Sequence, residues 1–116
     1  MDGAHNPHGA RALAGHAKAC GVRPHLVFGA MKDKDLQGMA LALRAMEPLS
    51  VTLVHGKDER YASPEALREA WGNCSILDVP AAAARLEEPG EGTRLVTGSL
   101  FLLGDLLREM GIQPQL

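Results

Sequence analysis

The first residues of the chain, DGAHNP, place a carboxylate, an imidazole and an Asn-Pro step directly before an apolar helical pattern. Asp2 and His5 are three residues apart in a turn that leads into a helix N-terminus, where free backbone N–H groups and the helix dipole favour an anion. There Asp2 could accept hydrogen bonds from both hydroxyls of a ribose, and a neutral His5 could donate to a nucleotide or pack on it. Asp2 and Asn6 are also ordinary turn and capping residues, and spacing alone favours that interpretation.

A second group of reactive side chains follows the apolar run HLVFGAM, where Lys32 and Lys34 alternate with Asp33 and Asp35. A lysine at the carboxyl end of a strand can pair with a substrate carboxylate or stabilise a developing negative charge. Alternating charges are equally typical of a solvated loop before a helix cap. The segment HGKDER at 55–60 has no further signature, and we interpret it as an ordinary loop.

The segment TGS at 97–99 ends a predicted strand and opens a predicted helix. The hydroxyl of Ser99 and the nearby backbone amides could cap that helix or hold a carboxylate, and spacing does not separate the two roles.

Several kinds of site are disfavoured. His5, His8 and His16 lack the acid-His-His frame of a metal site, so no metal site built from protein ligands alone is predicted. The sequence contains no GxxxxGK[ST], GxGxxG, GxSxG or HExxH motif. A free-standing kinase, ATPase, dehydrogenase or hydrolase is therefore hard to support.

Composition sets broad limits on the protein. Its 116 residues are enough for one domain, 46% are apolar and only 3% are aromatic, so the core must be built mainly from Leu, Val and Ala. A formal charge of -2 gives no general reason to bind nucleic acid or an acidic membrane. Cys20 and Cys74 lie far apart without a CxxC frame, and we interpret both as small apolar packing residues in a reducing compartment. No apolar run reaches membrane-spanning length, and the protein is expected to be cytoplasmic.

Helices and strands are expected to alternate along the chain. The predicted helices begin at Pro7, Asp35, Pro64, Pro80 and Leu100, and the predicted strands are 25–29, 51–55, 75–79 and 94–98. In the last helix the apolar stripe is expected to comprise Leu100, Leu103, Leu107 and Met110. The strands are too apolar to leave one face of the sheet wet.

This alternation predicts an α/β fold, a Rossmann-like three-layer sandwich with a mainly parallel sheet and helices on both faces. Asp2-Gly3 is expected to end a further strand. In such sheets ligands bind beyond the carboxyl ends of the strands. Those ends are expected at 2–6, 31–35, 55–58 and 98–99.

Three stretches in order, DGAHNPHGARAL, VFGAMKDKDL and VTGSLFLLGDLL, resemble the C-terminal domain of bacterial dihydrofolate synthase/folylpolyglutamate synthase, a branch of the Mur ligase superfamily. The likeness covers essentially the whole chain. DxAHNP is shared with related Mur ligases, whereas the DKD and GSLFLLG stretches narrow the resemblance to the folate branch.

The resemblance implies ATP-dependent amide ligation, in which a pteroate or folate carboxylate becomes an acyl phosphate that the amine of L-glutamate attacks. Asp2 then corresponds to the ribose-binding acid, His5 to the ATP-contacting histidine, and Asn6 to the same ATP-binding motif. Lys34, with Lys32 beside it, falls near the incoming amino acid, and Ser99 falls in a comparable place. ATP and Mg²⁺ are held mainly by the N-terminal ATPase domain of the family.

Residues 1–116 are therefore expected to form a Mur ligase C-terminal domain without that ATPase domain, and the isolated chain is predicted to have no ligase activity and weak affinity for ATP. Two alternatives remain open: a stand-alone Rossmann-like module that binds a nucleotide or a protein partner without catalysis, and a structural remnant of a split gene. The resemblance does not choose between dihydrofolate synthase, folylpolyglutamate synthase or both, and it leaves the oligomeric state open.

Overall fold

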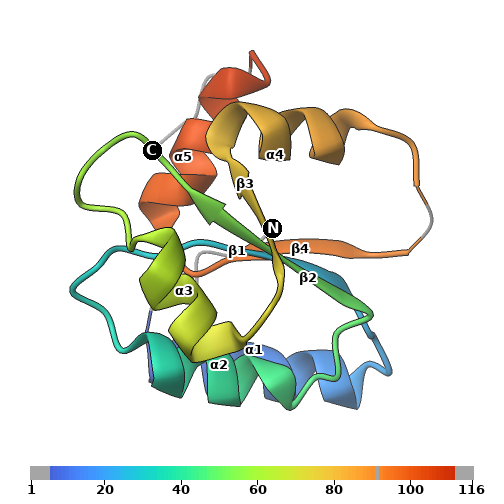
Figure 1. Ribbon diagram of the computed structural model, residues 1–116. Coiled ribbons are helices and arrows are strands. Elements are labelled where there is room, and N and C mark those ends of the chain that lie inside the picture. The colour runs from blue at the N-terminus through green and yellow to red at the C-terminus, as the bar shows by residue number, and fades with distance from the viewer. Residues whose placement is uncertain (1–5, 91, 112–116) are drawn as a thin grey trace.

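The computed structural model describes residues 6–90 and 92–111, and in this part of the chain helices and strands alternate (Figure 1). The elements are α1 (Pro7–Ala19), β1 (His25–Phe28), α2 (Leu36–Arg44), β2 (Ser50–His55), α3 (Pro64–Trp71), β3 (Ser75–Asp78), α4 (Val79–Glu87), β4 (Arg94–Thr97) and α5 (Leu100–Glu109). None of the described helices combines the length and the apolar character needed to cross a membrane.

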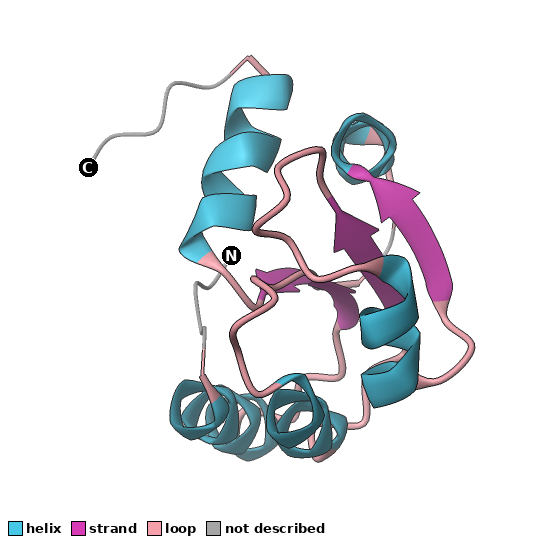
Figure 2. Ribbon diagram, turned by 60° about the vertical axis from the view of Figure 1, so that its left-hand side comes forward, coloured by secondary structure: helices cyan, strands magenta, loops and turns pink. Residues whose placement is uncertain are grey.

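The four described strands form one parallel sheet in the order β3-β2-β1-β4. Helices α1, α2 and α3 cover one face, and α4 and α5 cover the other (Figure 1). Figure 2 shows α1 and α2 side by side beneath the sheet. The predicted α/β class, with a parallel sheet between two helical layers, is confirmed.

Each described helix begins at a side chain that accepts a hydrogen bond from the backbone of its first turn, which satisfies a donor that would otherwise lack a partner. The caps are Asn6, Asp35, Ser63, Asp78 and Ser99. Helix α4 begins at Val79, one residue earlier than predicted, because Asp78 is both the last residue of β3 and the cap of α4. No loop separates that strand from its helix.

The core has one apolar cluster on each face of the sheet. The first includes three alanines of α1, Met39 and Leu43 of α2, and Trp71 of α3, which packs on Phe28 with ring centroids 5.2 Å apart. Alanines at this interface let α1 approach α2 and the sheet closely. The second cluster joins α4 and α5 to Val27, Val54 and Val96 of the strands.

The stripe predicted for the last helix is only partly correct: Leu103 and Met110 pack against the second core cluster, but neither is fully buried. Leu102 and Leu106 of α5 are fully buried, whereas Leu103 and Leu107 are only half-buried. Helix α5 contacts both α4 and β4, and six of its ten residues are Leu or Phe, so its apolar pattern fits more than one orientation. Contact with α4 and the sheet selects the face that is buried.

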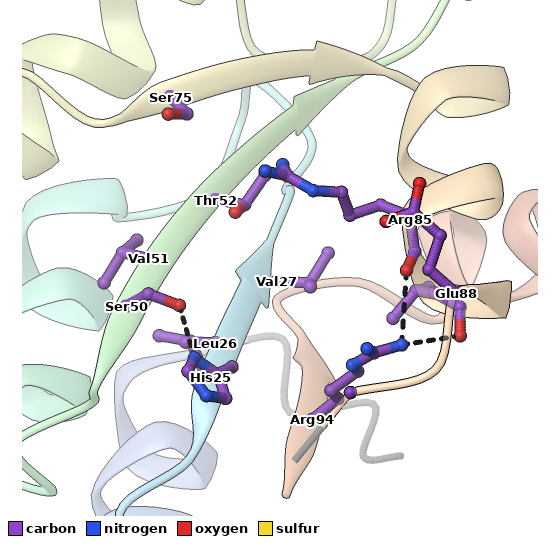
Figure 3. Close-up of a pocket in the computed structure, with 12 residues that line it drawn as sticks. His25, Leu26, Val27, Ser50, Val51, Thr52, Ser75, Arg85, Glu88 and Arg94 are labelled. Carbon is purple, nitrogen blue, oxygen red and sulfur yellow. Dashed lines mark hydrogen bonds between the residues drawn. The ribbon is translucent and has the colours of Figure 1, made fainter. Parts of the chain in front are cut away.

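One face of the sheet is open at the amino ends of the strands, which contradicts the prediction that no face is wet. Helix α4 begins at the carboxyl end of β3 and leaves Ser50, Thr52 and Ser75 lining a cavity of about 400 Å³ (Figure 3). Arg94 borders this cavity and donates from its guanidinium to the carbonyl oxygens of Arg85 and Leu86, the last turn of α4.

The two cysteines differ from each other. Cys74 is half-buried against the first core cluster, as predicted. Cys20 is exposed, and its Sγ lies 3.8 Å from Nε2 of His16. The interpretation of Cys20 as a packing residue is wrong, because Cys20 caps the end of α1 and is exposed.

Candidate functional site

The loops that follow β1 and β2 are joined at the carboxyl edge of the sheet. The backbone N–H of Lys32 donates to the carbonyl oxygen of Arg60 at 2.8 Å, and that of Ala62 donates to the carbonyl oxygen of Ala30 at 2.9 Å. Met31 and Tyr61 form an antiparallel bridge between the same two loops. Two segments about thirty residues apart in the sequence therefore act as one structural unit.

This unit and the first turn of α5 enclose a cavity of about 370 Å³, which we call the Lys-Arg cavity. Its lining residues are Met31, Lys32, Asp33, Lys34, Arg60 and Phe101. Three cations face one acid, and Met31 and Phe101 supply an apolar surface between them. A site of this composition suits a small anion that carries a short aliphatic segment.

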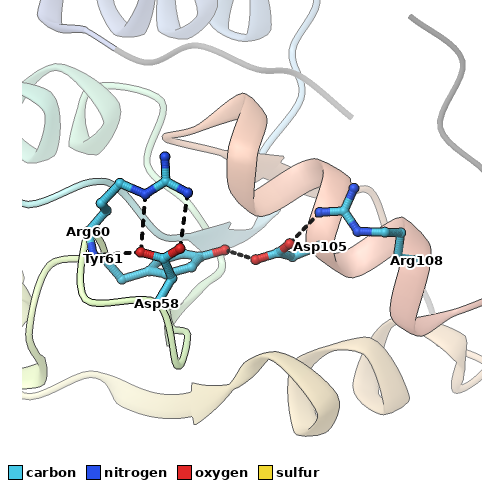
Figure 4. Close-up of polar contacts among 5 residues, drawn as sticks. All are labelled: Asp58, Arg60, Tyr61, Asp105 and Arg108. Carbon is cyan, nitrogen blue, oxygen red and sulfur yellow. Dashed lines mark hydrogen bonds and ion pairs between the residues drawn. The ribbon is translucent and has the colours of Figure 1, made fainter.

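Arg60 is held by two different contacts, of which Figure 4 shows the one with Asp58. Its Nε and Nη2 donate to Oδ1 and Oδ2 of Asp58 at 3.1 and 3.0 Å, and its guanidinium carbon lies 4.5 Å from the centre of the Phe101 ring. The side-chain hydrogen bond from Arg60 lowers the pKa of the Asp58 carboxyl below its ordinary value. Asp58 is therefore ionised at neutral pH and fixes the orientation of Arg60.

The loop after β2 is also anchored to α5. The hydroxyl of Tyr61 donates to Oδ2 of Asp105 at 2.7 Å, and the other carboxylate oxygen of Asp105 pairs with Arg108 (Figure 4). Burial, followed by the hydrogen bond to Asp105, raises the pKa of the Tyr61 phenol well above its ordinary range. Tyr61 therefore stays a neutral donor and ties the loop that carries Arg60 to the helix that carries Phe101.

The structure brings some of the predicted site residues together. Lys32 is exposed, Lys34 is half-buried, and both line the same cavity. Asn6 caps α1 by accepting from the N–H of Gly9 at 2.7 Å. The start of α1 lies beside the start of α2, since a Cβ built on Gly38 would approach Cγ of Pro7 to 3.1 Å.

The other predicted residues are separate from this cavity or outside the described part of the chain. Ser99 is 5% exposed, and its Oγ accepts from the backbone N–H groups of Phe101 and Leu102 at 3.1 and 3.4 Å. Its capping role is therefore present in the structure. Ser99 does not line the Lys-Arg cavity, but its helix places Phe101 there. Asp2 and His5 lie outside the described residues.

Sequence reasoning missed Arg60, because the loop 55–60 was interpreted as ordinary. Arg60 belongs to the site only because its loop pairs with the loop after β1, and no local sequence pattern predicts that pairing. The one available signal was the place of HGKDER after a strand, at the same edge as the lysines. Phe101 was likewise not considered as a site residue, although it follows the TGS segment directly.

A second cavity at the carboxyl edge, of about 500 Å³, lies between the loop after β2 and the last turns of α5. Its charged lining contains more acids than bases: His55, Lys57, Asp58, Asp78, Asp105, Arg108 and Glu109. In residues 6–90 and 92–111 no three His, Cys, Asp or Glu side chains are grouped so that they could hold a metal ion. Neither this cavity nor the open one at the amino ends contains a predicted site residue.

The parallel sheet between two helical layers belongs to a known class of ligase domain. The chain belongs to the family described as the Mur ligase, glutamate ligase domain, whose model matches residues 1–100. No curated protein sequence matches the chain significantly.

Solved structures of folylpolyglutamate synthases and of FolC have a similar fold. The Yersinia pestis bifunctional folylpolyglutamate synthase/dihydrofolate synthase, complexed with AMPPNP and Mn ion, is 25% identical with a TM-score of 0.80, over 97% of this chain and 28% of that one. The E. coli FolC protein in complex with DHPP and ADP is 29% identical with a TM-score of 0.72, over 96% of this chain and 28% of that one. The Mycobacterium tuberculosis folylpolyglutamate synthase complexed with ADP and AMPPCP is 26% identical with a TM-score of 0.74, over 99% of this chain and 30% of that one. The chain thus spans less than a third of the length of these proteins.

Proposed function

We propose that this chain is the glutamate-binding domain of an ATP-dependent ligase that joins L-glutamate to dihydropteroate or folate. The observation that carries the proposal is the Lys-Arg cavity, where Lys32, Lys34 and Arg60 surround the apolar surface of Met31 and Phe101. Glutamate has two carboxylates joined by a short aliphatic chain, which matches this arrangement of charge and apolar surface. The cavity also lies at the carboxyl edge of a parallel sheet, where ligands of such folds bind.

In the proposed reaction, ATP phosphorylates the pteroate or folate carboxylate to give an acyl phosphate and ADP. The amine of glutamate then attacks the carbonyl carbon, an amide bond forms, and phosphate leaves. The residues described here would contribute by binding and orienting glutamate, which makes the attack effectively intramolecular. Lys32 and Lys34 would hold a carboxylate, and Ser99 would organise the first turn of α5 beside it.

The nucleotide is assigned to the neighbouring part of the same edge. Asp2, His5 and Asn6 directly precede or cap α1, whose start lies beside α2 and the loop that carries the lysines. As the resemblance to the family implies, we place Mg²⁺ and the triphosphate mainly on an ATPase domain of the ligase and derive no step through them.

The proposal is tested by titrating the isotope-labelled chain with L-glutamate and following its amide NMR signals. Shifts concentrated at Lys32, Lys34 and Phe101, and weakened in a Lys32→Gln/Lys34→Gln variant, are the expected result. Unchanged signals from the residues of the Lys-Arg cavity, or shifts confined to the open cavity at the amino ends of the strands, would refute the proposal. In a parallel assay with ATP, Mg²⁺, dihydropteroate and glutamate, the chain alone should form neither ADP nor dihydrofolate.

A further inference from the structure

Arg60 keeps one edge of its guanidinium available for a ligand. A guanidinium has five N–H donors, and Asp58 takes one from Nε and one from Nη2. No group in the described ranges, 6–90 and 92–111, accepts from the three that remain, two on Nη1 and one on Nη2. One N–H of Nη1 and one of Nη2 form the edge next to the one that Asp58 holds, and they are arranged to bind a second carboxylate through two parallel hydrogen bonds.

We propose that this edge of Arg60 binds the side-chain carboxylate of the incoming amino acid and so selects glutamate over neutral amino acids. The inference rests on the proposed function, because it assigns a recognition residue to the same cavity. Discrimination of this kind is strong when a neutral substrate would leave a fixed charged donor without its partner.

The placement of Arg60 determines which of the two carboxylates it meets. The predicted nucleotide residues lead into α1, which belongs to the helical layer on one face of the sheet together with α2. Arg60 packs on Phe101 of α5, which belongs to the layer on the other face. An amine directed towards the acyl phosphate, which forms beside the nucleotide, keeps the α-carboxylate, which is on the same carbon, near the lysines. The side-chain carboxylate then extends towards Arg60.

Arg60 is also oriented before any ligand arrives. Asp58 holds two of its donors and accepts a further hydrogen bond from its backbone N–H at 2.9 Å, while the Phe101 ring supports the guanidinium. A side chain fixed in this way loses little rotamer entropy on binding, although it is 62% exposed. A lysine at this position has no planar fork and cannot serve Asp58 and a ligand with the same geometry.

The experiment compares L-glutamate with L-glutamine, which has the same shape but no side-chain charge. Both are titrated by NMR into the wild-type chain, Arg60→Gln and Arg60→Lys. Arg108→Gln serves as a matched control, because Arg108 is likewise exposed and paired with an aspartate two or three residues before it, but lies outside the Lys-Arg cavity. Dispersed amide signals verify that each variant is folded.

The expected result is that wild type prefers glutamate and that Arg60→Gln weakens glutamate binding roughly tenfold or more, with glutamine binding unchanged. Arg60→Lys should lose most of the same preference, and Arg108→Gln should retain it. Equal glutamate affinity in wild type and Arg60→Gln, with the lysine amides still shifting, would overturn this inference and leave the proposed function standing. Failure of glutamate to perturb the cavity of the wild-type chain would overturn both.

Discussion

Tyr61 and Asp105 are separated by 44 positions in the sequence, and a hydrogen bond of 2.7 Å joins the Tyr61 hydroxyl to Asp105 Oδ2. The ring of Tyr61 also meets that of Phe101 edge-on, with centroids 5.7 Å apart. These contacts connect the loop after β2 to the helix after β4. They therefore set the width of the Lys-Arg cavity, whose cations come from loops and whose apolar surface comes partly from α5.

The first prediction concerns the ionisation of Tyr61, the single tyrosine of the chain. Its pKa is raised above the ordinary 10.0, mainly by burial and then by Asp105. A raised folded-state pKa means that the neutral phenol contributes fully to stability below pH 10, and that this contribution is lost as the pH rises beyond that value. Near-ultraviolet absorbance should show no phenolate until the protein unfolds in alkali.

Asp105→Asn provides the control for this titration. It removes the negative charge of residue 105 and weakens the hydrogen bond, but leaves burial in place, so phenolate should appear at lower pH than in wild type. A wild-type phenol that ionises at its ordinary pKa while the chain is still folded would contradict the described contact.

The second prediction concerns Asp58. The hydrogen bonds from Arg60 lower its pKa below the ordinary 3.8, so the ion pair is fully formed above that value and is lost as the pH falls through the lower folded-state pKa. Carbon-13 NMR of the Asp58 carboxyl should give a midpoint below 3.8 in wild type and a higher one in Arg60→Gln. The same midpoint in both proteins would mean that Arg60 does not hold Asp58 in solution.

The third prediction compares two glycines. Gly98 has a φ of +110°, and a Cβ there would overlap the carbonyl oxygen of Gly29, the residue after β1. Gly98→Ala is expected to destabilise the protein by about 1–3 kcal/mol or more through backbone strain and displacement of β4 from β1.

Gly15 supplies the opposite case, because it is exposed within α1 and a Cβ there would meet nothing within 4 Å. Gly15→Ala should stabilise the protein by up to about 1 kcal/mol. Urea unfolding followed by the fluorescence of Trp71, the single tryptophan, measures both changes. A Gly98→Ala protein as stable as wild type would show that the β1–β4 contact is looser than described.

The helices were largely predictable because their signals are local. A capping side chain followed by proline marks the starts of α1 and α3. In α5 the apolar stripe was only partly predicted, since the helix is apolar on several sides and burial of Leu106 rather than Leu107 depends on α4.

The sequence by itself determined the order of helices and strands, the parallel α/β class, and the presence of reactive residues after the strands. It did so because capping, helical periodicity and strand character depend on neighbours within a few positions. Only the tertiary structure decided that Arg60 and Phe101 share a cavity with Lys32 and Lys34, and that the sheet is open at its amino ends. Pairing of distant strands brought these four side chains together, and the lengths of the helices left the amino ends of the strands uncovered. Both results depend on packing across the whole chain.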